Sequence, residues 1–185
     1  TTASGTASHA EGMLSSAQGL TAHAEGYNTE ATSNYSHSEG YGTSAESTAA
    51  HAQGYLTTAS GLYSHAEGRQ NNASGNSAHA EGQASVASGD VAHVEGFGCA
   101  ATGYASHAGG FESTASGLYS RAIGRASLAS ASNAFASGFG VIADQENSAV
   151  FGQFNTTEQA NLLFVVGNGS DNTARSDAFT ISEDS

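Results

Sequence analysis

The chain repeats one alternation of small and large side chains along most of its length. Histidine, numbered here as position zero, marks the repeat at every fourteenth residue from His9 to His107. Positions −1 and +1 are Ser or Ala in nearly every repeat. Positions −2, 0 and +2 carry larger side chains, for example Tyr63, His65 and Glu67. An alternation with a period of two predicts a β-strand with one face restricted to small residues.

The other half of the repeat follows the same rule. Position −6 is alanine in every repeat from Ala3 to Ala143, position −8 is Thr, Ser, Asn, Cys or Val, and position −4 is mostly glycine. Another glycine stands at +3 from Gly12 to Gly152 and supplies the backbone freedom that a tight turn needs. Each repeat therefore predicts two strands of about five residues joined by two tight turns.

A fixed period held through eleven repeats indicates a solenoid. The predicted fold is all-β: residues 1–154 form a parallel β-roll shaft or head, roughly 50 Å long at one strand spacing per repeat. From about Asn155 the period stops, and two strands are predicted at 162–166 and 178–181, with a Gly-Asn-Gly turn at 167–169. We interpret residues 155–185 as a C-terminal β cap or neck, because exposed end strands invite further pairing.

Composition adds the expectation that several chains associate. The 38% of hydrophobic residues are mostly alanine, and burying alanine yields only about 0.8 kcal/mol per carbon. Ordering the backbone costs about 1–2 kcal/mol per residue, so a lone ribbon needs a second burial surface. Large outward side chains at +4 and −2 offer that surface: Met13, Tyr27, Tyr41, Tyr55, Phe97, Phe111 and Phe139 at +4, and Tyr35, Tyr63, Val91 and Tyr119 at −2.

Charge and cysteine content exclude several classes. The net charge of −13 argues against nucleic acid and anionic membranes as partners, since both attract cationic surfaces. No run approaches the roughly 18 apolar residues of a spanning helix, so no membrane insertion is expected. Cys99 is the one cysteine; it falls in the small −8 column and is interpreted as a packed thiol. The chain begins and ends within its pattern, and we expect it to be a fragment or a processed piece.

Two segments carry a family resemblance. Ser-Arg-Ala-Ile-Gly at 120–124 and Asn-Ser-Ala-Val-Phe-Gly at 147–152 resemble the SVAIG repeat of YadA-like head domains in trimeric autotransporter adhesins. The resemblance covers roughly residues 1–154 and implies a left-handed parallel β-roll with three chains side by side, hence a homotrimer. The earlier repeats place His and Glu where that family has apolar residues.

The earlier form of the repeat, SHAEG…ASG, is similar instead to repeats in tail-fibre and appendage proteins of phages and prophages. The stretch from Gly167 to Phe179 strengthens this second likeness. In such fibres it often precedes a self-cleaving intramolecular chaperone that templates the trimer.

The histidines and the residues at +2 form the candidate functional columns. Both point to one side of the strand, and stacking places each imidazole about 4.8 Å from the next. Two charged imidazoles at that distance repel by about 3 kcal/mol, so we expect a ladder that is neutral or balanced by glutamate. The candidate residues are His9, Glu11, His23, Glu25, His37, Glu39, His51, Gln53, His65, Glu67, His79, Glu81, His93, Glu95 and His107.

Three hypotheses compete for this ladder. It is a hydrogen-bonded chain–chain interface, or a set of symmetry-related histidines that binds metal or anions on a threefold axis, or a solvent-facing column. The metal candidates are His9, His23, His37, His51, His65, His79, His93 and His107, and Zn, Ni and Fe are the metals that imidazole suits. No other cofactor is expected.

Catalysis is not expected. Serine, histidine and acid recur throughout the repeats, so a chance triad carries no information, and no single repeat holds an odd constellation. There is no phosphate-binding glycine loop, no His-Glu-x-x-His and no Asp-rich calcium nonapeptide. An ice-binding solenoid is a further alternative because Thr-x-Ser recurs at −7 and −5, although Glu30, Glu46, Asn72 and Val86 interrupt any flat threonine face.

These observations predict a rigid trimeric rod that serves as a structural or receptor-binding fibre segment of a viral tail appendage. Its partners are two copies of itself and a host-surface receptor or glycan, and its location is the virion tail. The alternative is the head of a bacterial trimeric autotransporter adhesin at the cell surface.

Overall fold

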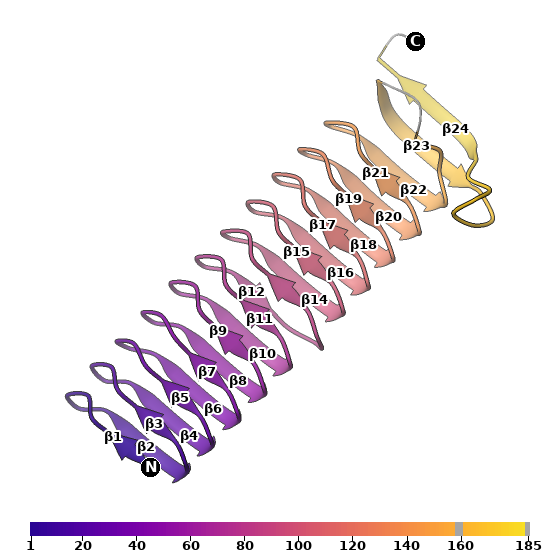
Figure 1. Cartoon of the computed structure of the whole chain (residues 1–185). Helices are drawn as coiled ribbons and strands as arrows, with labels where there is room; N and C mark the ends of the chain where they lie inside the picture. Colours follow the sequence, from indigo (N-terminus) through magenta and orange to yellow (C-terminus); the bar gives the residue numbers. More distant parts are fainter. Residues whose placement is uncertain (158–160, 184–185) are drawn as a thin grey trace.

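The computed structural model describes residues 1–157 and 161–183 as one elongated parallel β-solenoid (Figure 1). The coils stack along a single axis, with the N-terminus at one end and the C-terminal strands at the other. The described residues form no helix, and therefore none long and apolar enough to cross a membrane.

Each coil, called a rung below, contributes one strand to each of two sheets. The long strands of the rungs belong to a 13-stranded sheet: β2 (His9–Met13), β4 (His23–Tyr27), β6 (His37–Tyr41), β8 (His51–Tyr55), β10 (His65–Arg69), β12 (His79–Ala80), β14 (His93–Phe97), β16 (His107–Phe111), β18 (Arg121–Arg125), β20 (Phe135–Phe139) and β22 (Ala149–Gln153). The short strands form an 11-stranded sheet: β1 (Thr2–Ala3), β3 (Ser16–Ala17), β5 (Glu30–Ala31), β7 (Ser44–Ala45), β9 (Thr58–Ala59), β11 (Asn72–Ala73), β13 (Val86–Ala87), β15 (Ala100–Ala101), β17 (Thr114–Ala115), β19 (Leu128–Ala129) and β21 (Ile142–Ala143).

The register between rungs confirms the predicted period. Neighbouring strands pair in parallel with an offset of one whole repeat, so His65 lies opposite both His51 and His79. The predicted parallel solenoid is therefore confirmed. The strand that each rung contributes to the 11-stranded sheet is shorter than predicted, at two residues instead of about five. It ends where two successive amides converge on one carbonyl oxygen of the next rung, as those of Ser60 and Gly61 do on Ala73 O.

The core consists of four columns of small side chains. The alanines at −6 from Ala17 to Ala143 have no exposed area, and those at +1 from Ala24 to Ala136 are equally buried. Positions −1 and −8 complete the interior. Most of their hydroxyl groups donate to nearby carbonyl oxygens, as Ser64 Oγ does to Gly61 O at 2.7 Å, whereas Thr29 Oγ1 is buried without a hydrogen-bond partner.

Two turn positions in every rung, −2 and +5, adopt a left-handed backbone, although most of the residues there are not glycine. Position −2 is an example, with Tyr35 at φ 60° and Tyr63 at φ 58°. The prediction that −2 belongs to the outward strand face was wrong, since it lies in a turn. The conformation has a role: strand amides donate to the following rung, whereas the amide of Tyr35 donates back to Leu20 O at 2.9 Å.

Two strands follow the last regular rung. β23 (Leu162–Asn168) pairs in parallel with β22, and β24 (Asp177–Ser182) pairs antiparallel with β23 at the edge of the sheet. The two predicted strands are thus present, although Gly167 and Asn168 belong to β23 and not to the turn. That residues 155–185 act as a cap or neck stays a prediction; 158–160 and 184–185 of this segment lie outside the described residues.

Candidate functional site

The eight histidines form one continuous stack on the outward face of the 13-stranded sheet. From His23 to His107 the ring centroids are 4.6–5.0 Å apart and the ring planes differ by at most 23°. The terminal His9 meets His23 edge-on at 5.0 Å. The parallel register fixes this arrangement, because it places position zero of each rung directly over the previous one. The predicted spacing of about 4.8 Å is confirmed.

Glutamates flank the imidazole stack, but they do so in two different ways. In the first rungs each acid approaches the histidine of its own rung, as Glu39 Oε2 does at 3.7 Å from His37 Nε2. Later the acid reaches forward: Glu81 Oε1 lies 3.4 Å from Nε2 of His93. Glu95 likewise lies 3.5 Å from His107. Glu81 and Glu95 therefore contact the histidine of the next rung and not that of their own.

The ladder is half-buried within a single chain. The side-chain exposure of His37 is 37%, and that of His107 is 26%. Burial lowers the pKa of His51, His79 and His107, and the neighbouring imidazoles lower it further. These three groups are therefore biased toward the neutral form, as expected for the ladder.

Several ring nitrogens in the stack lack a hydrogen-bond partner although they are shielded from water. The nitrogen is Nε2 in each case, and the residues are His23, His37, His51, His65, His79 and His107. Glutamate oxygens lie at 3.7–3.9 Å from the Nε2 atoms of His23, His37 and His65, beyond normal hydrogen-bond length. The nearest glutamate oxygen to Nε2 of His107 is Glu95 Oε1, at 3.5 Å. In the tautomer that carries its hydrogen on Nδ1, such a nitrogen can bind a proton or a metal ion, or accept a hydrogen bond from another chain.

A second outward column runs beside the ladder at position +4. Tyr27, Tyr41 and Tyr55 stack at centroid distances of 4.9 and 5.1 Å. Farther along, the guanidinium of Arg125 lies between the rings of Phe111 and Phe139, at 5.8 and 4.8 Å. These aromatic side chains remain 37–47% exposed, and a monomer therefore presents an apolar stripe along its length.

A shallow groove of about 380 Å³ follows part of the glutamate column. It is lined by Glu25, Gly26, Glu39, Gly40, Gln53 and Gly54. The glycines leave this strip of the sheet without side chains, which makes it a surface on which another chain or an extended ligand can lie.

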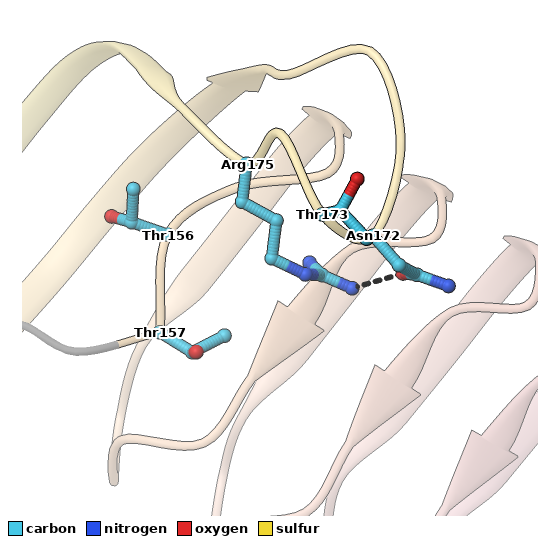
Figure 2. A pocket seen from close by; sticks show the side chains of 5 residues that line it. All are labelled: Thr156, Thr157, Asn172, Thr173 and Arg175. Carbon is cyan, nitrogen blue, oxygen red and sulfur yellow. Dashed lines mark hydrogen bonds between the residues drawn. The ribbon is translucent and has the colours of Figure 1, made fainter.

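A separate polar pocket of about 280 Å³ lies at the C-terminal end (Figure 2). The side chain of Arg175 extends between Thr156 and Thr157 on one side and the Asn172–Thr173 turn on the other. Its guanidinium donates to the carbonyl oxygens of Gly140 and Asn155, both at 3.0 Å, and to Asn172 Oδ1 at 2.7 Å.

The guanidinium of Arg175 also lies 5.7 Å from the ring centroid of Phe154. These contacts tie the β23–β24 connection to the last regular rungs, so the role that the geometry supports for Arg175 is structural. The repeat pattern does not single out this arginine, and its one signal in the sequence is its place as the one cation after residue 154.

Cys99 lies in the core, where only 1% of its surface is exposed. Burial raises the pKa of its thiol, which leaves it protonated and unreactive in the folded chain. The interpretation as a packed thiol fits this position.

The candidate columns can hold protons, metal ions or a partner chain. The structure brings the predicted histidines and acids together on one face, and it adds the aromatic column and the acid–histidine contacts between rungs. No protein-family model matches the sequence, and a search of curated proteins found no similar sequence.

Proposed function

We propose that this chain is a rod-forming segment of a phage or prophage tail appendage that assembles as a homotrimer and contributes to host attachment. The resemblance of its repeats to those of fibre and YadA-like head proteins motivates the proposal. The parallel β-solenoid is compatible with such a rod, because every added rung lengthens it along one axis.

The observation that carries the proposal is the contrast between the core and the edges of the coil. The core holds mostly alanine and serine, whereas large apolar side chains are exposed along two different edges. One edge carries the +4 aromatic column, and the other carries −3 and −2 residues such as Leu62 and Tyr63, at 43% and 64% exposure.

Two apolar edges suit a closed ring of identical chains. In a cyclic trimer each chain uses two different surfaces, one toward each neighbour. Burial of both edges would supply the apolar area that the alanine core lacks. It would also bring the histidine ladder and the Gly-lined groove close to a neighbouring chain.

Mass measurement in solution tests the assembly. Light scattering after size exclusion should give three times the 18.4 kDa of one chain. A double variant, Tyr41→Glu with Tyr55→Glu, should lower the mass toward one chain, because charges would enter the proposed contact. The matched control Thr58→Glu, on the outer face of the short-strand sheet, should keep the trimer. A monomeric wild-type chain would contradict the proposal.

A binding assay separates the fibre from the adhesin head. Labelled wild-type chain should bind intact bacterial cells and leave immobilised animal matrix proteins unbound. Binding to matrix proteins or animal cells alone would favour the alternative, the head of a bacterial trimeric adhesin.

A further inference from the structure

The outer strand of one rung differs from those of its neighbours. β12 ends at Ala80 after two residues, whereas the adjacent β10 and β14 each have five. Asn71 stands in the buried −8 column of this region, and its Nδ2 donates to Gly82 O at 2.7 Å. Glu81, the residue before Gly82, lies outside the strand, and its carboxylate extends toward His93 in the next rung.

Two carboxylates approach one imidazole in this region. Glu67 still approaches the histidine of its own rung, with Oε2 3.8 Å from His65 Nε2. Glu81 belongs to the rung that follows. Ligand atoms of Glu67, His79 and Glu81 consequently lie within 4.8 Å of one another. Within residues 1–157 and 161–183, this is the one group of three such side chains that converges so closely.

The central imidazole has an unused ligand atom. Nε2 of His79 is shielded from water and has no hydrogen-bond partner. Its ring is nearly parallel to those of His65 and His93, at 10° and 2°. The stack therefore fixes the orientation of His79 and holds it among the two acids.

We propose that Glu67, His79 and Glu81 form a binding site for a divalent transition-metal ion of the zinc type. One imidazole and two carboxylates supply three protein ligands, and water can occupy a fourth position. Zinc–ligand bonds of about 2.0–2.2 Å place tetrahedral ligand atoms about 3.4 Å apart. Small rotations of the two half-exposed glutamates bring the present separation to that value.

The charge distribution favours a cation at this point. The ion pairs among the described residues all join a histidine to a glutamate. The guanidinium of Arg69, on the same strand as Glu67, lies over the ring of Tyr55 at 5.8 Å. A bound metal ion would offset the repulsion between the two carboxylates. All three ligands come from one chain, so the site does not depend on the proposed trimer.

Titration calorimetry with Zn²⁺ tests the site on the complete, tag-free, chelator-treated chain. The wild type should show one strongest site per chain. Glu67→Gln and Glu81→Gln should each raise the dissociation constant of that site by about tenfold or more, since each removes a charged ligand. Zinc-edge X-ray absorption should show one imidazole in a nitrogen and oxygen shell, and His79→Gln should remove the imidazole signature.

Glu39→Gln is the matched control, because Glu39 approaches a stacked histidine but, among the described residues, belongs to no group of three metal-ligating side chains whose ligand atoms lie within 4.8 Å of one another. Its dissociation constant for Zn²⁺ should stay within twofold of the wild type. Circular dichroism should show the same β-structure in all variants. Absence of saturable Zn²⁺ binding, or equal weakening by Glu39→Gln and Glu81→Gln, would overturn the proposal. The trimer mass is measured separately, so either proposal can fail alone.

Discussion

The outward face of the 13-stranded sheet has two regions built on one core. From β4 to β16 it carries imidazoles stacked face to face and flanked by acids, and His9 of β2 meets the end of this stack edge-on. From β20 to β24 it carries phenylalanines that meet at steeper angles, with Phe151 5.3 Å from Phe135 and 5.5 Å from Phe164. Beneath both regions the alanines at +1 and −6 and the glycine at +3 are nearly unchanged as far as β22.

The comparison distinguishes the residues that determine the coil from the outward side chains that can vary without changing it. The inward columns and the glycine turns set the path of the backbone, since they are common to both regions. The outward columns vary from ionic to apolar without altering the register of one repeat per rung. Coil stability should therefore respond alike to core changes in both regions, and differently to changes on the surface.

The largest expected effect comes from the glycine column. Gly68 has φ +95°, and a Cβ there would lie 2.3 Å from Gly82 O. Gly138 has φ +152°, and its Cβ would lie 1.9 Å from Gly152 O. Each Gly→Ala substitution should destabilise the chain by about 3 kcal/mol or more, through backbone strain and overlap, as measured by thermal or urea unfolding.

The two regions should behave alike in this test. A large effect at one glycine with a small effect at the other would contradict the idea of a common coil. Gly42→Ala is a milder control, because a Cβ there meets the flexible side chain of Leu56 instead of backbone.

Removal of one ring from each stack should lower the free energy of unfolding by different amounts in the two regions. Phe151→Ala should cost about 2 kcal/mol, because it deletes two aromatic contacts and apolar burial. His37→Ala, which removes a ring from the middle of the other stack, should cost about 1 kcal/mol or less, since the side chain is 37% exposed. Urea unfolding measures both. An equal or larger loss at His37 would show that the imidazole stack contributes as much as the phenylalanines.

Acid should act on the histidine region. Burial and the neighbouring histidines lower the pKa of His51, and Glu39 opposes this shift. Burial, His93 and Arg121 lower the pKa of His107, and Glu95 opposes this shift. A lowered pKa in the folded state means that the unfolded chain binds protons first as pH falls. The contribution of these histidines to the free energy of unfolding is therefore fully present above the unfolded pKa of about 6.5, and it is lost as the pH falls toward the lower folded pKa.

The melting temperature should accordingly fall by a few degrees between pH 7 and pH 5. The double variant His51→Gln, His107→Gln should give a flatter profile. A wild-type melting temperature that rises or stays level over this range would show that the glutamates outweigh burial.

The smallest effect should come from a single acid of the ladder. Glu39→Gln should change the free energy of unfolding by less than about 0.5 kcal/mol, because the pair with His37 is half-exposed and 3.7 Å long. Melting at low and at high salt checks this, and the wild type and the variant should converge at high salt. A loss of more than about twice that size would indicate a stronger, buried pair.

Much of the solenoid could be predicted from the sequence, because stacking in register makes each column uniform. The alanines from Ala17 to Ala143 and the histidine spacing follow directly from the repeat period. The ladder could be predicted as a set for the same reason: parallel pairing without slippage places identical positions over one another.

The departures could not be predicted, because they depend on hydrogen bonds between rungs. Tyr35 and Tyr63 suggest a strand by residue type, yet their amides donate to the preceding rung, which requires a left-handed backbone. Glu81 reaches forward beside Asn71, whose side-chain amide donates to carbonyl oxygens in two different rungs. Nothing in the repeat pattern distinguishes Asn71 from the serines and threonines of its column.

The constant offset between strands has a consequence for how such a chain can change length. From β1 to β22 each strand pairs with the equivalent strand one unit later, so duplication or deletion of one whole unit recreates each contact at the junction. Each unit would lengthen or shorten the molecule by one strand spacing, about 4.8 Å. A single-residue insertion would instead place outward side chains in the core. The length of the molecule can therefore change in steps of one whole repeat without any change in the contacts between strands.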